Sequence, residues 1–316
     1  MNRLSLFIIG MPRSGTKLLR TILNNHSNIY IPDVETLFIT RILKKYGGKN
    51  LSDKDAKEVK QIIQDSLFYF YYFKDRSFDF PTSLSNNETA VSLLDTFFEN
   101  LSNTQNKKMK IIGDKSPNYI FDIDILSRYY PKAKFIHIIR DPRDIVVSMN
   151  NAWNKNVFRS AYRWALGIES FNKANKLNSI EIRYEDLLNN SKDVVKSICY
   201  FLNVPFEDKM MKISKSVENY GSAKGMSGIL QSNTKKYRDK LTEKQIKLIE
   251  GYTFKYLKKY GYSLDSDQIM PISPSGFKLY IWALFDRVNL ILFSINEYGL
   301  CRGIQKVVKA YRERIK

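Results

Sequence analysis

Residues 4–20 read LSLFIIGMPRSGTKLLR, and this stretch decides the fold. Its apolar first part predicts a buried strand, and its last part predicts a helix that begins near Gly15. Between them, residues 10–15 are few enough to form a tight loop that points several backbone N–H groups into one concavity. The helix N-terminus adds about half a positive charge at the same place. The stretch therefore predicts an anion site that fits a phosphate group.

The loop departs in one respect from the phosphate loop of ATPases and GTPases, which reads G-x-x-x-x-G-K-[ST]. Gly10 and Gly15 have the right spacing, but Thr16 and Lys17 follow in the reverse order. Lys17 stands where that motif has the hydroxyl that holds Mg²⁺, and an ammonium group cannot bind a cation. Arg13 supplies a cation within the loop itself. The pattern predicts a phosphate cradle without a metal, suited to a nucleotide whose reacting group carries less charge than a triphosphate.

The composition limits the class of protein. The chain has 316 residues, a hydrophobic content of 43% and a formal net charge of +19, which fit one large α/β domain with anionic partners. The charge alone does not choose among nucleotides, nucleic acid, acidic membranes and acidic substrates. Cys199 and Cys301 have no metal-site spacing and sit among apolar residues, which predicts buried thiols in a reducing, cytoplasmic setting.

Apolar runs at residues 4–9, 109–113, 134–139 and 180–184 alternate with helical patterns. This alternation predicts an α/β, phosphate-loop-like three-layer fold, with a central parallel β-sheet flanked by helices and a C-terminal helical appendage. Ligands of such folds lie at the carboxyl ends of the strands, where the polar clusters of this chain fall. We also expect a short strand at 29–31 and helices at 15–24, 36–46, 53–74, 88–105, 120–130, 190–203, 207–215 and 242–260.

A second polar cluster follows the run 134–139. Arg140 stands at the end of this predicted strand, and Ser148 lies two turns into the helix that follows. A guanidinium fork and a hydroxyl together fit a phosphate monoester. The alternative is an exposed set of salt bridges at the start of the helix, formed by Arg140, Asp141, Arg143 and Asp144.

Together, the loop and the Arg-x₇-Ser pattern resemble the sulfotransferases that use 3′-phosphoadenosine 5′-phosphosulfate (PAPS). The stretch from Gly10 to Thr36 is most similar to the tyrosylprotein branch and to bacterial relatives, which carry a Pro-Arg-Ser-Gly-Thr-Thr loop and a later Glu-Thr pair. The resemblance implies metal-independent, in-line transfer of a sulfuryl group from PAPS to a hydroxyl acceptor, with 3′-phosphoadenosine 5′-phosphate (PAP) as product. It implies a PAPS-binding sulfotransferase domain within residues 1–265. The Pro, Asp and Ser residues that follow, and the helical spacing of apolar residues after 276, predict a linker and amphipathic, basic helices at 266–316.

The resemblance also implies roles in binding the nucleotide. Arg13 would steady the bridging and sulfuryl oxygens, and Lys17 would add charge near the nucleotide. The 5′-phosphate would be bound by Ser14, Gly15 and Thr16, and the 3′-phosphate by Arg140 and Ser148.

In the resembled branch, a Glu at the place of Glu35 is the general base. This chain has one more residue between the loop and that Glu, so Asp33 is a second candidate. Glu35 could instead be a helix N-terminal carboxylate that the helix dipole favours. Lys115 ends a predicted strand, and the resemblance gives it the role of stabilising the sulfuryl group, whereas the alternative is a surface lysine.

The two histidines are less suited to act as the base. His137 lies within the apolar run 134–139, which predicts a core histidine, and His26 lies at a helix end, where it can cap. Cytosolic sulfotransferases place a catalytic histidine just after a Lys-Thr pair, and this chain has no histidine after Lys115, so the resemblance implies a carboxylate base instead.

A basic segment at 222–240 precedes the last helix of the main domain. Lys235, Lys236 or Arg238 could reach the 3′-phosphate, and Tyr237 could line the adenine. The alternative is a mobile basic loop that does not contact the nucleotide.

Near the C-terminus, apolar residues of 277–295 recur at helical spacing, but charged residues interrupt them, so no membrane-spanning segment is expected. A basic tail follows, which fits peripheral contact with the inner face of the cell membrane. Packing on the main domain and a homodimer contact are the alternatives. The aromatic segment 68–73 either lines the acceptor site or belongs to the core.

The sequence leaves the acceptor open among a glycan, a glycolipid and a peptide tyrosine. Two other classes of function remain as alternatives. One is a nucleotide kinase or NTPase with a variant phosphate loop, and the other is a non-enzymatic basic protein that binds membranes or nucleic acid. No nucleic-acid-binding motif is present, so no nucleic-acid partner is expected.

Overall fold

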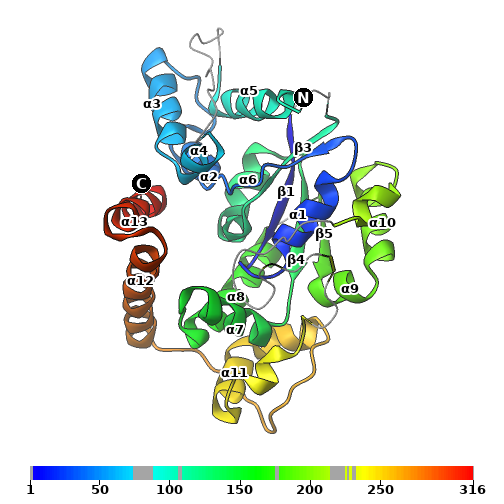
Figure 1. Cartoon of the computed structure of the whole chain (residues 1–316), viewed down its shortest axis with the longest axis vertical. Helices are drawn as coiled ribbons and strands as arrows, with labels where there is room; N and C mark the ends of the chain where they lie inside the picture. The colour runs from blue at the N-terminus through cyan, green and yellow to red at the C-terminus, as the bar shows by residue number, and fades with distance from the viewer. Residues whose placement is uncertain are drawn as a thin grey trace.

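The computed structural model describes residues 3–73, 88–105, 109–174, 178–213, 225, 228–229 and 233–315. Its strands form one parallel sheet, and the predicted α/β class is confirmed (Figure 1). The order across the sheet is β2-β3-β1-β4-β5, so the strand that precedes the loop lies at the centre. The strands are β1 (Leu4–Gly10), β2 (Ile29–Tyr30), β3 (Ile111–Lys115), β4 (Lys134–Ile139) and β5 (Asn178–Arg183).

Helices cover both faces of the sheet because β1 is apolar on both sides. Leu6 and Ile8 pack with α1 (Thr16–Asn24), α9 (Tyr184–Asn189) and α10 (Ser191–Leu202) on one face. Phe7 and Ile9 pack on the other face with α2 (Phe38–Tyr46), α3 (Asp53–Gln64), α4 (Leu67–Tyr72), α5 (Ala90–Asn103) and α6 (Ile123–Tyr129). A third apolar cluster joins the end of β4 to α7 (Pro142–Trp153), α8 (Val157–Lys173) and α11 (Glu243–Lys259). Short 3₁₀ turns complete the fold at η1 (Pro117–Asp122), η2 (Asp208–Met211) and η3 (Lys236–Asp239).

Three sequence-based expectations about helices were wrong in detail. The helix expected at 53–74 is two helices, α3 and α4, because the Ser66 hydroxyl accepts a hydrogen bond from the Tyr69 N–H and caps a new helix. The helix expected at 207–215 is only the turn η2, and residues 214–215 lie outside the described residues. Helix α8 was not expected at all, and it begins after α7 ends at Asn154, which has a left-handed backbone conformation.

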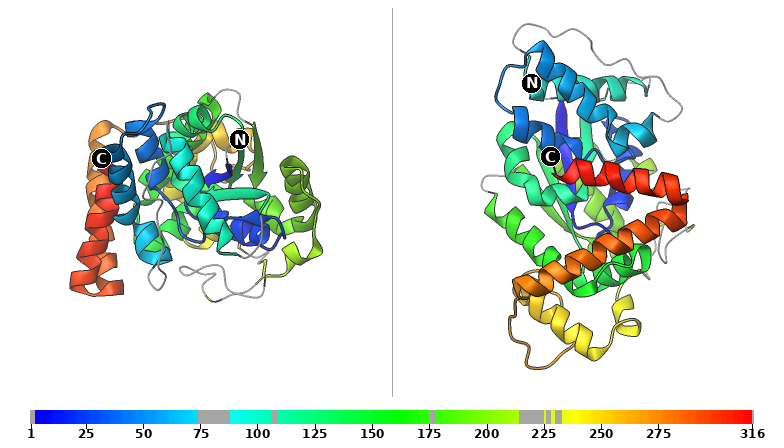
Figure 2. Two further views of the ribbon diagram at one scale, coloured as in Figure 1. Left: turned by 90° about the horizontal axis from the view of Figure 1, so that it is seen from above. Right: turned by 90° about the vertical axis from the view of Figure 1, so that its left-hand side faces the viewer.

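The C-terminal residues form a helical hairpin of α12 (Gly276–Tyr298) and α13 (Leu300–Ile315) that lies across one side of the main domain (Figure 2). Helix α12 contacts α7 and α8, and α13 contacts α4. Within the described residues, α12 alone is long and apolar enough to cross a membrane by length and composition, whereas its charged residues led to the expectation of no spanning segment. Cys199 is buried as expected, but Cys301, which follows the turn of the hairpin, is exposed.

The first glycine of the loop sets how closely β1 can approach β4. Gly10 has a φ of 151°, and a Cβ built on it would lie 2.5 Å from the carbonyl oxygen of Ile138. We expect Gly10→Ala to lower the free energy of unfolding by about 2 kcal/mol or more, because a backbone atom of the central sheet would have to move. Urea denaturation followed by tryptophan fluorescence would measure this.

The matched control is Gly276→Ala at the start of α12, where the added Cβ would meet no atom within 4 Å. We expect this variant to unfold within about 0.5 kcal/mol of the wild type. Equal stability of the two variants would contradict the proposed close approach.

Candidate active site

Three adjacent strand ends bring the predicted polar clusters to one edge of the sheet. Strand β1 lies between β3 and β4, with Ile8 opposite Lys115 and Gly10 opposite Ile138. The loop that follows β1 therefore has Lys115 on one side and Arg140, the first residue after β4, on the other. This is the edge where parallel α/β sheets bind ligands.

The loop is built to receive an anion. Gly15 has a φ of 94°, and a Cβ there would lie 2.3 Å from the ring of Tyr184, so the loop closes against that ring. Helix α1 has no side-chain N-cap and no acidic residue in its first turn. The Ser14 hydroxyl is buried and has no hydrogen-bond partner among the described residues. A buried donor of this kind is satisfied when an acceptor binds, so the residues fit a phosphate group.

Arg140 fixes the loop from the β4 side. Its Nη1 donates to the carbonyl oxygen of Arg13 at 3.0 Å, and its Nη2 donates to the carbonyl oxygen of Asn233 at 2.8 Å. Its guanidinium lies 4.5 Å from the centre of the Tyr184 ring. The buried Nε of Arg140 has no partner in the part of the chain that the structure describes. The side chain is thus held in place with one donor left for an anion.

The loop cation and the helix hydroxyl contact each other. The Nε of Arg13 donates to the Oγ of Ser148 at 3.0 Å, and its guanidinium lies 5.7 Å from the ring centre of Trp153. Both partners belong to α7. The resemblance placed Arg13 at the sulfuryl end of the nucleotide and Ser148 at its 3′-phosphate. Because the two side chains contact each other, both can contact a single phosphate-containing ligand.

On the β3 side, Glu35 and Lys115 form an ion pair. The Nζ of Lys115 donates to Oε1 of Glu35 at 2.8 Å. The lysine side chain is 1% exposed and that of the glutamate is 35% exposed. The amine is thus buried behind a carboxylate that remains accessible to a substrate.

A buried polar cluster holds the backbone next to Glu35. The Oγ1 of Thr36 donates to Oδ1 of Asp114 at 2.8 Å, and its backbone N–H donates to the Oγ of Ser116 at 3.0 Å. The hydroxyl of Tyr119 lies 3.2 Å from the same Thr36 Oγ1. Burial raises the pKa of the Asp114 carboxyl to about 6, although the Thr36 hydroxyl acts in the opposite direction.

The second candidate base, Asp33, lies in a different environment. It is exposed, and its charge acts on Arg20 of α1. Burial lowers the pKa of the Arg20 guanidinium, and the charge of Asp33 partly offsets this effect. Glu35 is thus the carboxylate of this segment that is paired with the buried Lys115.

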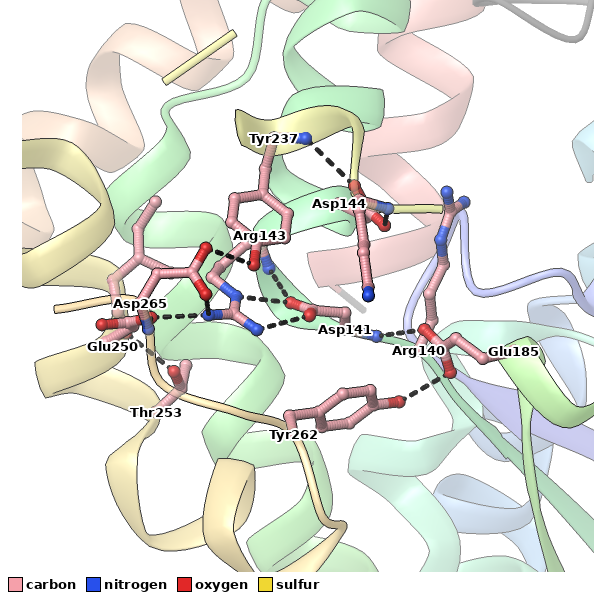
Figure 3. A network of polar contacts seen from close by, with 12 residues as sticks. Arg140, Asp141, Arg143, Asp144, Glu185, Tyr237, Glu250, Thr253, Tyr262 and Asp265 are labelled. Carbon is pink, nitrogen blue, oxygen red and sulfur yellow. Dashed lines mark hydrogen bonds and ion pairs between the residues drawn. The ribbon is translucent and has the colours of Figure 1, made fainter. Parts of the chain in front are cut away.

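The acidic and basic residues at the start of α7 are buried, so an exposed salt-bridge set is excluded (Figure 3). Arg143 donates to both carboxylate oxygens of Asp141, at 3.0 and 2.7 Å, and to Oε1 of Glu250 at 2.5 Å. Glu250 also accepts hydrogen bonds from the backbone N–H groups of Asp265 and Ser266. This network joins α7, α11 and the residues after α11.

The same network positions the basic segment that contains η3. Asp144 accepts hydrogen bonds from the backbone N–H groups of Lys235 at 2.7 Å and Tyr237 at 3.2 Å (Figure 3). The Tyr237 ring is buried, lies 4.3 Å from the Arg143 guanidinium, and its hydroxyl donates to Asp265. Arg238 donates to both carboxylate oxygens of Asp265 at 2.9 Å.

Lys236 is the basic residue of this segment that is electrostatically coupled to Arg140. Burial lowers the pKa of its amine, and the positive charge of Arg140 lowers it further. The role of Tyr237 in lining the adenine, and those of Lys235 and Arg238 in reaching the 3′-phosphate, remain predictions. In the structure, the side chains of Tyr237 and Arg238 contact Asp265. Ser222 and Lys224 of the predicted segment lie outside the described residues.

Both histidines have partners away from the loop. His137 is buried in β4 with its Nδ1 3.1 Å from Oε2 of Glu181, and burial lowers the pKa of its imidazole. His26 lies 2.9 Å from the carbonyl oxygen of Pro205, and its Nδ1 accepts from the backbone N–H of Asn28. These contacts match the structural roles expected from the sequence.

Sequence reasoning missed four residues that shape the site. Tyr184 follows β5 at the same sheet edge, and its place at a strand end was the available signal. Asp114 could have been found in the same way, because it is an acidic residue at the end of an apolar run. No sequence signal pointed to Trp153 or Asn233, because Trp153 contacts Arg13, and Asn233 contacts Arg140, only through the tertiary fold.

The comparisons with known proteins agree with this geometry. The model of the sulfotransferase family matches residues 5–208. An uncharacterized protein from Aquifex aeolicus (strain VF5) is 24% identical over 298 residues, which cover 86% of this chain and 35% of that protein. Protein-tyrosine sulfotransferase 1 of Danio rerio is 24% identical over 234 residues, which cover 70% of this chain and 58% of that protein. The chain therefore spans well under two thirds of the length of these curated relatives.

Among solved structures, the sulfotransferase domain from the curacin biosynthetic pathway has the same fold. It superposes with a TM-score of 0.54 at 22% sequence identity, covering 83% of this chain and 98% of that domain.

The raised pKa of Asp114 predicts a pH-dependent stability. A carboxyl with a pKa near 3.8 when unfolded and about 6 when folded favours the fold while protonated, and loses that advantage as the pH rises through 6. Asn cannot ionise. We therefore expect the free energy of unfolding of the wild type, relative to Asp114→Asn, to fall by about 2.4 kcal/mol between pH 4 and pH 7. Urea titrations at several pH values would measure it.

The control is Asp124→Asn, at an exposed position of α6, whose difference from the wild type should change much less over the same range. If the difference in the free energy of unfolding between the wild type and Asp114→Asn stayed constant from pH 4 to pH 7, the buried carboxyl would not titrate in this range.

Proposed function

This chain belongs to the sulfotransferase family, and we propose that it transfers a sulfuryl group from PAPS to a hydroxyl acceptor and releases PAP. The observation that carries the proposal is the pairing of an accessible carboxylate, Glu35, with a buried amine, Lys115, beside a loop suited to phosphate. The acceptor belongs to the class of glycans, glycolipids or peptide tyrosines. The name of the Danio rerio relative supports a peptide tyrosine.

The residues of the loop and of α7 fit the phosphate groups of PAPS. The buried Ser14 hydroxyl and the uncapped N-terminus of α1 are suited to the 5′-phosphate, together with Gly15 and Thr16. Lys17 adds positive charge on α1. The 3′-phosphate is assigned to Arg140 through its unsatisfied Nε, to the Ser148 hydroxyl, and to Lys236, whose charge is coupled to Arg140. When bound, PAPS supplies the sulfuryl group.

The chain contributes a base and two cations to the reaction. Glu35 accepts the proton of the acceptor hydroxyl, which makes its oxygen a better nucleophile. Lys115, which holds Glu35 in place, and Arg13, which is held by Ser148, stabilise the negative charge that develops on the sulfuryl and leaving phosphate oxygens. The site acts by position and electrostatics, with Glu35 held by Lys115 at the end of β3 and Arg13 held by Ser148 of α7.

The role of Ser148 can be tested by nucleotide binding. We expect Ser148→Ala to weaken PAP binding about tenfold, because it removes a hydroxyl from the phosphate site and releases Arg13. Isothermal titration calorimetry in the presence of EDTA would measure the affinity for PAP, and a separate titration without EDTA would measure the affinity for Mg²⁺–ATP. Tighter binding of Mg²⁺–ATP than of PAP would instead favour a kinase or NTPase.

Ser197→Ala is the matched control, since this helix serine is exposed on α10 and bonds only to a backbone carbonyl of its own helix. Its PAP affinity should equal that of the wild type. An unchanged affinity in Ser148→Ala would exclude this residue from the phosphate site.

The role of Glu35 can be tested by turnover. We expect Glu35→Gln to reduce sulfuryl transfer from ³⁵S-labelled PAPS by about a hundredfold or more, because the base is lost, and to leave PAP affinity nearly unchanged. A panel of tyrosyl peptides and glycans would serve as acceptors. Asp33→Asn is the control variant and should retain turnover. Loss of turnover in Asp33→Asn, but not in Glu35→Gln, would transfer the role of base to Asp33.

A further inference from the structure

Helix α12 buries three polar side chains and exposes many of its large apolar ones. Asp286, Asn289 and Ser294 are its buried residues. Eight large apolar side chains between Phe277 and Leu292 are 40–75% exposed. A surface helix of a globular protein normally has the opposite arrangement. We call these eight side chains, together with the exposed Leu300, Ile304 and Val308 of α13, the outer face of the hairpin.

Specific contacts fix this orientation. Oδ1 of Asp286 accepts a hydrogen bond from the backbone N–H of Asn156 at 2.7 Å, and its Oδ2 pairs with Arg159 at 2.6 Å. One turn further, the Asn289 side chain donates to the carbonyl oxygen of Asn154 at 2.8 Å. The polar side of α12 is therefore anchored to the junction between α7 and α8, and the outer face must point away from the main domain.

The charge of the hairpin indicates what covers this face. Residues 276–315 contain seven Lys or Arg and three Asp or Glu, and one of these acids, Asp286, is already paired with Arg159. The Lys306 amine lies 3.5 Å from the ring centre of Tyr298 and 5.0 Å from that of Tyr71. The Lys309 amine lies 5.1 Å from the ring of Phe70. Three further cations of the hairpin, Lys278, Arg287 and Arg302, are exposed, and exposed apolar and cationic side chains together suit the headgroup region of an anionic bilayer.

A second copy of this chain is a poorer fit to the same face. The chain carries a formal net charge of +19, and a symmetric dimer through the hairpin would bring two sets of cations together. We propose that the outer face of the hairpin docks on the surface of an anionic lipid bilayer, with α12 lying in the plane of the interface.

The anchoring contacts favour a helix that lies on the bilayer over one that crosses it. The length and composition of α12 would permit a crossing. A crossing would withdraw Asp286 from Arg159 and Asn156 and place an ionisable side chain in lipid, which is unfavourable. Docking by the outer face leaves all of these contacts in place.

Cys301 provides a reporter for the test. It is exposed at the start of α13, whereas Cys199 is buried and burial raises the pKa of its thiol to about 11. An environment-sensitive maleimide should therefore label Cys301 of the folded full-length chain. We expect its emission to shift to the blue, and the protein to sediment, with phosphatidylglycerol-containing vesicles and much less with phosphatidylcholine vesicles. High salt should weaken this binding.

Two variants and a control test the surface. We expect Leu292→Glu to reduce vesicle affinity about tenfold or more, because it places a charge on the apolar face. Arg302→Glu, at an exposed site, should reduce affinity several-fold and flatten its salt dependence. Tyr200→Glu is the matched control, since Tyr200 is 87% exposed on α10, on the far face of the sheet, and should leave binding unchanged.

Three outcomes would overturn the proposal. The first is vesicle binding that Leu292→Glu and Tyr200→Glu affect equally. The second is a dimer in analytical ultracentrifugation that Leu292→Glu dissociates, without binding to vesicles, which would assign the face to a second copy. The third is retention in the membrane after an alkaline carbonate wash, which would indicate a spanning helix.

Discussion

The guanidinium of Arg140 is the contact on which the candidate site depends. It joins the carbonyl oxygens of Arg13 and Asn233 and stacks on the ring of Tyr184, so that three distant segments of the chain meet around one side chain. A planar group with five fixed donors can make these contacts and still present an N–H to a ligand, which a lysine ammonium cannot do with the same geometry. The loop after β1 therefore receives its shape from a residue at the end of β4.

The buried charges around Arg143 explain why α7 can serve as a rigid support. Two carboxylates, Asp141 and Glu250, are hydrogen-bonded to its guanidinium, and that of Asp265 lies 3.9 Å away. Glu250 also accepts two backbone N–H groups, so little of the buried charge is left uncompensated. A network of this kind adds little net stability but fixes one arrangement of the elements it joins, which we infer is its role here. The position of α7 sets where Ser148 and Trp153 lie. It also sets where η3 lies, because Asp144 of α7 accepts hydrogen bonds from the backbone of Lys235 and Tyr237.

The sequence predicted the sheet, the loop and the strand-end residues because these follow from local pattern. Lys115 was expected at this sheet edge because parallel strands end together, whereas its partner Glu35, 80 residues away, was expected at the site only from the family resemblance. Helix α8 was not expected, although its buried residues Ala161, Trp164, Ala165 and Ile168 recur at helical spacing. The burial of Tyr237 was not predictable, since its partners Arg143 and Asp265 come from other elements. Cys301 is exposed because the hairpin turns its apolar face outward.

The central position of β1 has a consequence for the order in which this chain can fold. Its partners in the sheet come about a hundred or more residues later, since Leu6 pairs with Gly113 and Ile9 with His137. Asn233, which completes the contacts of Arg140, is translated still later. At about 5–20 residues per second, a ribosome needs roughly ten to forty seconds to synthesise the segment between Gly10 and Asn233. Until β3 and β4 have been synthesised, the apolar strand β1 has neither of its neighbours in the sheet, so a nascent chain of this topology would depend on chaperones to reach the sheet intact.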